Sequence, residues 1–448
     1  MNFIHVFTQV ILGLIGLGVV VFVHEAGHFI AARLVGIDVE AFSIGWGKAL
    51  LKKRIGAVEY RLGMFPVGGY CKMRGENDFR EAYEQNAARI PQTPGAYFGA
   101  APWRRIIVCL AGPLFNLIFA VLVMAVIWGA GFEFQTLGNR IILASDISPG
   151  ERYPADQAGL KSGDRIVMIN GKPAVNSRDI QEAISPNAGK NLVLTLDRDG
   201  RTLECTIQPL LDKSTGAGRI GVSFWVDPVA GAILPESPAA IAGLLPGDRI
   251  LRINGQDVPY TAALFRILQD QPAVLSLEYG REGRILNTDL IPIYDDSGAA
   301  ELGIQYQTIT YRAPAYTLPG ALVKGASEAW KTLTLYLQSL ALLFRGIDLT
   351  QAVSGPVRIT VMAGEAATAG LGAMASFLSV ISIALCIMNL LPLPVLDGGM
   401  IALFIVEAFR RRPLHPKALF AFQTAGAVLI FGLMLFAVFG DILFLARR

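Results

Sequence analysis

The apolar positions of this chain fall into four long runs on either side of a polar middle segment. Residues 1–35, 103–130 and 418–440 each hold an apolar stretch long enough for a helix of about 20 residues to cross a bilayer. Residues 373–409 form the third run in chain order, and its segment 389–399 is broken by prolines and glycines. Such irregular backbone is tolerated at membrane depth only where it packs in protein or lines a cavity. The pattern predicts a multi-span α-helical membrane protein with four transmembrane helices.

The polar middle segment, residues 131–312, contains an internal repeat. The sequence GLKSGDRIVMING of residues 159–171 returns as GLLPGDRILRING at residues 243–255, with nine of thirteen positions identical. The separation of 84 residues predicts two similar α+β domains, residues 131–222 and 223–312. Their G-D-R-I and I-N-G elements resemble those of PDZ domains, which bind peptides as an added strand.

The distribution of charge orients the predicted spans. Residues 36–102 are rich in lysine and arginine, and basic residues also fill the connection 410–417. The positive-inside rule places both segments in the cytoplasm, so the repeated domains lie outside. Residues 313–372 connect the repeats to the third span, and residues 333–344 within them are predicted to form an amphipathic or interfacial helix.

Composition excludes several classes of protein. The 448 residues are 53% hydrophobic and only 17% charged, and the mean hydropathy of +0.47 is too high for an ordinary soluble protein. The formal net charge of +3 is too small to indicate a nucleic-acid partner. The cysteines lie in different predicted parts of the chain, which excludes a disulfide framework and a zinc–thiolate site: Cys71, Cys109, Cys205 and Cys386.

The cytoplasmic segment contains a β-rich stretch, residues 57–74. Residues 58–73 have strand-like composition interrupted by Gly63, Pro66, Gly68 and Gly69, which predicts short hairpins near the membrane. Two interpretations stay open. The stretch is either an ordinary turn-rich loop or an exposed strand edge that pairs with an unwound substrate segment.

A cluster of ionisable side chains lies inside the first apolar run. His24, Glu25 and His28 form an H-E-x-x-H sequence, and residues 10–23 before it carry no ionisable side chain. Burying these three groups unpaired would cost several kcal/mol. On a helix the two histidines lie one turn apart on the same face and can bind one metal ion, with Glu25 beside them as a general base. The spacing predicts a zinc hydrolase.

A catalytic zinc ion needs a third protein ligand and an open position for water. The two other histidines are badly placed, because His5 lies nineteen residues before the H-E-x-x-H sequence and His415 lies in a cytoplasmic connection. The third ligand is then a carboxylate in a span, and Asp397, Glu407 and Asp441 are the candidates. We predict Asp397, because Glu407 can pair with the arginines that follow it and Asp441 lies at the external end of the fourth span.

The motifs of this chain, taken in order, resemble those of the site-2 protease family of intramembrane zinc metalloproteases. They are HEAGH (24–28), GGYCKM (68–73), AGPLFN (111–116), the tandem PDZ-like repeats, SGPVRI (354–359) and NLLPLPVLDGG (389–399). The resemblance implies that Asn116 and Asn389 contact the substrate backbone. If residues 58–73 form an exposed strand edge, Gly68, Gly69 and Tyr70 are further predicted substrate-binding residues. One departure is Met400, where members of the family commonly have histidine.

The same resemblance implies regulated intramembrane proteolysis in the inner membrane of a bacterium. The expected substrates are single-span membrane proteins, such as a trimmed anti-sigma factor, and remnant signal peptides. The repeated domains would lie in the periplasm and exclude substrates that still carry large external domains. The competing interpretation is a non-catalytic membrane PDZ scaffold with a structural metal, which predicts four protein ligands and leaves Glu25 without a role.

Overall fold

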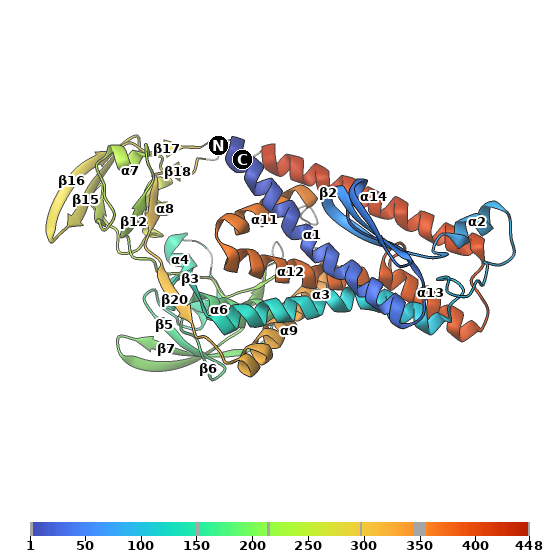
Figure 1. Cartoon of the computed structure of the whole chain (residues 1–448). Helices are drawn as coiled ribbons and strands as arrows, with labels where there is room; N and C mark the ends of the chain where they lie inside the picture. The colour runs from blue at the N-terminus through green and yellow to red at the C-terminus, as the bar shows by residue number, and fades with distance from the viewer. Residues whose placement is uncertain are drawn as a thin grey trace. The chain divides into compact units, whose positions relative to one another are not determined.

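A computed structural model describes residues 3–148, 150, 152–212, 216–295, 298–343 and 355–446 of the chain. The chain divides into two compact units. One unit comprises Met1–Phe132 and Pro314–Arg448, and the other comprises Glu133–Ala313. The first unit is mainly helical, and the second holds most of the strands (Figure 1).

The helices of the first unit include the membrane spans. They are α1 (Phe3–Leu34), α2 (Asp78–Glu84), α3 (Pro102–Ala130), α9 (Leu318–Leu343), α11 (Pro356–Thr368), α12 (Leu371–Leu390), α13 (Asp397–Arg410) and α14 (Pro416–Ala446). Within the described part of the chain, four stretches are long and apolar enough to cross a membrane: Thr8–Leu34, Pro102–Ala130, Leu371–Leu390 and Pro416–Asp441. The prediction of a multi-pass membrane protein with four candidate spans is therefore confirmed.

The predicted break in the third apolar run separates two helices. α12 ends at Leu390 and α13 begins at Asp397, so only α12 is long enough to be the span. The connecting segment folds back on the first turn of α13, because a Cβ at Gly399 would lie only 2.7 Å from the carbonyl carbon of Leu393. Val395 has φ +74°, a conformation that costs a β-branched residue about 1–3 kcal/mol. This strained turn sets where Asp397 lies.

The two strands of the first unit form one sheet. β1 (Val39–Ile55) and β2 (Val58–Met73) are joined by a turn at Gly56 and Ala57, and residues 49–55 pair antiparallel with residues 58–63 across it. Residues 39–44 of β1 pair antiparallel with residues 69–73 of β2 on one side and lie beside residues 59–62 on the other. The short hairpins predicted within residues 58–73 are wrong, because the two parts of this stretch, residues 58–63 and 69–73, each pair with β1 and not with each other. A Cβ at Gly63 would lie 2.7 Å from the backbone nitrogen of Trp46, so glycine is needed for the two backbones to approach.

Helix α9 is longer than the predicted linker helix, since it begins at Leu318 rather than at residue 333. Ala321 and Ala329 are buried, and a Cβ at Gly325 between them would lie 2.6 Å from the backbone nitrogen of Ala125 in α3. Small residues at four-residue spacing thus allow α9 to pack closely on α3. The predicted end of this helix at residue 344, and Ser354 of the SGPVRI motif, lie outside the described residues.

The second unit contains two copies of one small α+β arrangement. Its strands are β3 (Phe132–Thr136), β4 (Ile141–Leu143), β5 (Arg165–Ile169), β6 (Lys172–Pro173), β7 (Leu192–Arg198), β8 (Arg201–Ile207), β9 (Leu210–Leu211), β10 (Gly218–Arg219), β11 (Val222–Phe224), β12 (Ala230–Ile233), β13 (Arg249–Ile253), β14 (Gln256–Asp257), β15 (Leu275–Arg281), β16 (Arg284–Leu290), β17 (Ile293–Tyr294), β18 (Ala300–Glu301), β19 (Ile304–Tyr306) and β20 (Ile309–Ala313). Its helices are α4 (Ala144–Ile147), α5 (Pro154–Gln157), α6 (Ser177–Ile184), the 3-10 turn Ser185–Asn187, α7 (Pro238–Ile241) and α8 (Ala263–Leu268).

The sheets of the two copies have the same topology. One has strand order β6-β5-β7-β8 and the other β14-β13-β15-β16, with antiparallel pairing throughout. The repeated G-D-R-I sequence explains part of this likeness. Asp164 is buried and accepts two hydrogen bonds of 2.7 Å from Arg198, and Asp248 does the same with Arg281 at 2.7 and 2.6 Å. Each pair ties the loop before one strand to its neighbour in the sheet.

Candidate metal centre

Helix α1 presents His24 and His28 on one face, as their four-residue spacing predicts. The Nε2 atoms of the two imidazoles lie 3.1 Å apart, with the rings nearly perpendicular at 86°. Glycine allows α3 to approach this face. A Cβ at Gly112 would meet His28 Nε2 and would lie 2.7 Å from His24 Cε1. Any larger residue at that position would displace the imidazoles.

Asp397 completes a group of three side chains. It is the first residue of α13, and its Oδ2 and Oδ1 atoms lie 3.2 Å from His24 Nε2 and 3.5 Å from His28 Nε2. One donor atom from each of the three residues lies within 4.8 Å of the other two. Residues more than 360 positions apart in the sequence thus converge on one point.

The geometry of this group fits a zinc ion. Ligand atoms placed tetrahedrally at about 2.0–2.1 Å from zinc lie about 3.3 Å from one another. The two imidazole nitrogens here are 3.1 Å apart, and each has an oxygen of the Asp397 carboxylate at 3.2 or 3.5 Å. Two imidazole nitrogens and a carboxylate are also a donor set that zinc prefers. The side chains of His24 and Asp397 keep 12% and 18% of their surface exposed, which is compatible with an open fourth position.

The second nitrogen of His28 has a partner that fixes its role. His28 Nδ1 lies 2.8 Å from the carbonyl oxygen of Val108 in α3, an atom that can only accept. Nδ1 therefore carries the proton, and Nε2 presents its lone pair to the group.

Glu25 points from α1 toward the hairpin. Its Oε2 atom accepts a hydrogen bond of 2.9 Å from the backbone N–H of Cys71 in β2, and its Cγ would lie 3.5 Å from a Cβ at Gly69. The predicted base is thus held against the GGYC part of β2. Burial raises the pKa of the Cys71 thiol, with Glu25 adding to the effect, so this cysteine stays neutral.

The remaining predicted site residues divide into two groups, those on β2 and the two asparagines near His24. Gly68 is in β2 with φ +83°, and the hydroxyl of Tyr70 accepts a hydrogen bond of 3.0 Å from Arg61. Asn116 and Asn389 both approach His24, with Nδ2 at 3.4 Å from Nδ1 and at 3.5 Å from Nε2, respectively. Asn116 has no exposed surface, whereas Asn389 is half-buried.

The two carboxylates that competed with Asp397 have other partners. Glu407 forms two contacts with Arg105, of 2.6 and 3.2 Å, so its predicted pairing with the arginines after it is wrong. Asp441 accepts hydrogen bonds from the backbone N–H groups of Gly355 and Arg358 at 3.0 and 3.2 Å, and so caps α11 from another helix. The sequence carried one signal for the first pair: Arg105 and Glu407 are opposite charges at predicted cytoplasmic ends of two spans.

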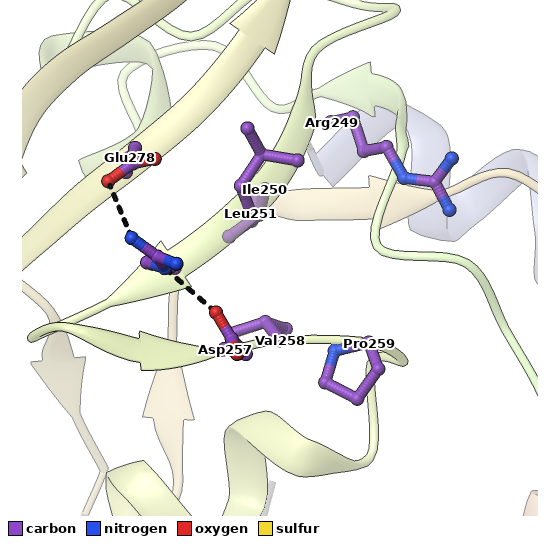
Figure 2. A pocket seen from close by; sticks show the side chains of 8 residues that line it. Arg249, Ile250, Leu251, Asp257, Val258, Pro259 and Glu278 are labelled. Atoms are coloured by element: carbon purple, nitrogen blue, oxygen red, sulfur yellow. Dashed lines mark hydrogen bonds and ion pairs between the residues drawn. The ribbon is translucent and has the colours of Figure 1, made fainter.

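The second unit has a pocket with charged and apolar lining that offers no comparable chemistry. It has a volume of about 380 Å³ and lies over β13, β14 and β15 in the second copy (Figure 2). Its charges already pair, because Arg252 lies 2.8 Å from Asp257 and 3.9 Å from Glu278. Among the described residues, the only group suited to a metal is therefore the one in the first unit.

The fold and this group define a multi-pass membrane protein with a buried metal-binding centre of two histidines and one aspartate. Comparison with protein families identifies it further. The model of peptidase family M50 matches residues 12–433, and the chain belongs to this family.

Curated relatives align with it over nearly their whole length. A "Putative zinc metalloprotease" of Treponema pallidum (strain Nichols) is 35% identical over 446 residues, covering 98% of this chain and 99% of the relative. The "Regulator of sigma E protease" of Haemophilus influenzae is 30% identical, and "Regulator of sigma-E protease RseP" of Escherichia coli K12 is 28% identical; both cover 96% of this chain and 97% of the relative. The chain is thus a zinc metalloprotease similar to RseP, which confirms the predicted family, reaction class and cofactor.

Proposed function

We propose that this protease hydrolyses peptide bonds within the membrane-spanning segments of single-span membrane proteins. The observation that carries the proposal is the position of the metal group on the candidate span α1 and the helix α13, with Glu25 beside it. Anti-sigma factors and remnant signal peptides are the substrates that the relatives' names and the family resemblance suggest. We further propose an inner-membrane location with residues 36–102 and 410–417 in the cytoplasm.

Each side chain of the centre has a role in this proposal. His24, His28 and Asp397 hold the zinc ion, which when bound acts as a Lewis acid on the scissile carbonyl and lowers the pKa of water toward about 7. Glu25 takes the proton of the attacking water and passes it to the leaving amine. The hydrogen bond from the Cys71 N–H keeps the Glu25 carboxylate oriented before substrate arrives.

The β1–β2 hairpin is proposed to hold the substrate. A peptide bond in a helix has its carbonyl already hydrogen-bonded, so the segment must unwind before attack. Among the described residues, residues 69–73 of β2 pair with β1 on one side only, and an extended segment can add to the other edge. Gly68, Gly69 and Tyr70 lie on β2 next to the strand position that binds Glu25, so this part of the edge is next to the centre. Asn389 is the proposed polar contact to the substrate backbone.

The second unit is proposed to be a pair of PDZ domains in the periplasm, residues 131–222 and 223–312, that excludes substrates with large external domains. Its repeated sheets support this assignment. Strands β3 and β20 pair with each other, so residues 137–308 can be replaced by a short turn. We expect the shortened protein to cleave substrates that still carry a folded external domain, which the full-length protein leaves intact.

The decisive experiment replaces Glu25 with Gln. The variant should bind zinc with unchanged stoichiometry and cleave a model single-span substrate in detergent at least about 10²-fold more slowly, because a neutral amide cannot accept the water's proton. Replacement of Glu76 with Gln is the matched control, since this side chain lies in the same region and bonds the N–H of Met73. An active Glu25→Gln enzyme would remove Glu25 from the mechanism, and the scaffold alternative would gain support from a zinc-bound protein with four protein ligands and no hydrolysis.

A further inference from the structure

We propose that Asn116 is a positioning residue for the zinc ligand His24, through a hydrogen bond from His24 Nδ1–H to Asn116 Oδ1, and that it does not contact the substrate. The inference deepens the proposed function and rests on His24 being a ligand of the metal. It gives different roles to Asn116 and Asn389, for which the family resemblance implies the same role.

Burial keeps Asn116 away from the substrate. The residue has 0% of its surface exposed, between α1, α3 and α12. Its own backbone carbonyl accepts a hydrogen bond of 2.9 Å from the Ser382 hydroxyl of α12, so the position of the residue in α3 is held from a second helix. An unwound peptide could reach its amide only by separating these helices.

The amide of Asn116 has an unusual set of neighbours. Its Nδ2 group lies 3.4 Å from His24 Nδ1, and its Oδ1 atom is buried without a hydrogen-bond partner among the described residues. An orphaned buried carbonyl costs about 1–3 kcal/mol. Few native groups are left in this state.

If His24 binds the metal, its Nδ1 atom needs a hydrogen-bond acceptor as its neighbour. The Nε2 atom of His24 faces Asp397 and His28, so its lone pair is the one available to zinc. An imidazole that binds a metal through Nε2 carries its proton on Nδ1 and must donate there. An Nδ2 group is a donor as well, so two donors would face each other.

A half-turn of the amide ends the contact of two donors at His24 and gives Oδ1 a partner, while the NH₂ group takes the former position of Oδ1. The oxygen and nitrogen of an asparagine amide are nearly the same size, so exchanging them leaves the packing unchanged. Oδ1 then accepts from His24 Nδ1–H and is no longer orphaned. The arrangement matches that of His28, whose Nδ1–H donates to the Val108 carbonyl of the same helix. Helix α3 thereby supplies one acceptor to each imidazole.

Asn389 lacks these features. It is half-buried, and its Nδ2 group lies 3.5 Å from His24 Nε2, on the side of the ring that faces the metal position. This residue can reach a peptide that approaches the zinc ion. The structure thus assigns the two asparagines to opposite sides of one imidazole.

Zinc affinity tests the inference without relying on activity. We would purify wild type, Asn116→Leu, Asn116→Asp and Asn389→Leu in detergent and measure the zinc Kd of each by competition with a chromophoric chelator, together with kcat and KM on a model substrate. Asn116→Leu removes the acceptor while keeping the branched shape of the side chain, and should weaken zinc binding about 10–100-fold. Asn116→Asp keeps an acceptor and should recover at least about tenfold of that loss. Asn389→Leu should bind zinc within about twofold of wild type while losing kcat/KM.

The outcomes separate this inference from the function on which it rests. If Asn116→Leu binds zinc like wild type and loses only kcat/KM, as expected for Asn389→Leu, Asn116 is a substrate contact and the inference is wrong. If Asn116→Leu and Asn116→Asp weaken zinc equally, the acceptor is not what matters, and the inference is again wrong. If wild type itself binds no zinc, or keeps it when His24 is replaced, the proposed metal site fails instead.

Discussion

We expect the placement of Asp397 to depend on a buried ion pair at the other end of its helix. Glu407 lies ten residues after Asp397 in α13, about 15 Å away along the axis. Its carboxylate binds the Arg105 guanidinium of α3 through contacts of 2.6 and 3.2 Å, and the two side chains are only 8% and 2% exposed. The guanidinium also lies 4.4 Å from the ring centre of Phe404 and donates to the carbonyl of Ala100.

The expected change in the free energy of unfolding follows from the burial of both charges. Removing one partner of such a pair leaves the other charge uncompensated, which costs about 3–5 kcal/mol, whereas replacing both by apolar residues is often close to neutral. Arg105→Met and Glu407→Leu should each lower the free energy of unfolding by about 3–5 kcal/mol, and the double variant should lie within about 2 kcal/mol of wild type. Because α13 carries Asp397, the single variants should also bind zinc more weakly.

Unfolding in mixed micelles, followed by far-UV circular dichroism, measures the free energy of unfolding of the three variants. Competition with a chelator measures their zinc affinity. Arg104→Met is the matched control, since Arg104 is the neighbouring cation in α3 but is exposed. It should change stability by less than about 1 kcal/mol. Single variants as stable as this control, or a double variant whose loss equals the sum of the single losses, would refute the reasoning.

Three further predictions test other parts of the structure. Gly112→Ala should weaken zinc binding about tenfold or more, because the new Cβ would meet both imidazoles, whereas Gly129→Ala, with its nearest neighbour at 3.4 Å, should not. Burial alone would raise the pKa of Asp164, but hydrogen bonds from Arg198 and from the backbone lower it below the usual value, so its contribution to stability is complete above the unfolded pKa and is lost as the pH falls through the folded pKa. Pulse proteolysis between pH 5 and 2 should therefore show that residues 133–313 lose less protection on acidification in Asp164→Asn than in wild type. An equal loss in the two proteins would contradict a stabilising role of the Asp164–Arg198 pair. Asp441→Ala removes the cap of α11 and should cost about 0.5–2 kcal/mol in the same unfolding assay, with Asp441→Asn closer to wild type.

Much of the fold follows from local patterns. The four candidate spans are apolar runs of sufficient length, and the middle unit repeats a sequence that forms the same sheet twice. The two histidines share a face because a helix turns once in about 3.6 residues. Asp397 was predicted as their partner by elimination and depth, and the structure brings it to within 3.5 Å of both imidazoles.

The β hairpin could not be predicted in the same way. Its glycines and proline look like strand breaks in the sequence, because a lone segment gives no sign of a partner. In the structure a Cβ at Gly63 or Gly69 would lie 2.7 Å from a backbone atom of β1, so these two glycines permit the strands to pair closely. The partner strand, residues 39–55, lies outside the stretch that composition marked as β-rich.

What the sequence determined by itself is therefore the set of elements and the kinds of atom that bind the metal. The tertiary structure decided which groups surround those atoms: the Val108 carbonyl beside His28, the Cys71 N–H on Glu25, and Arg105 rather than a neighbouring arginine on Glu407. These contacts join residues 80, 46 and 302 positions apart. Hydrophobic periodicity acts over one or two helical turns, whereas such hydrogen bonds exist only once the helices have packed and excluded water.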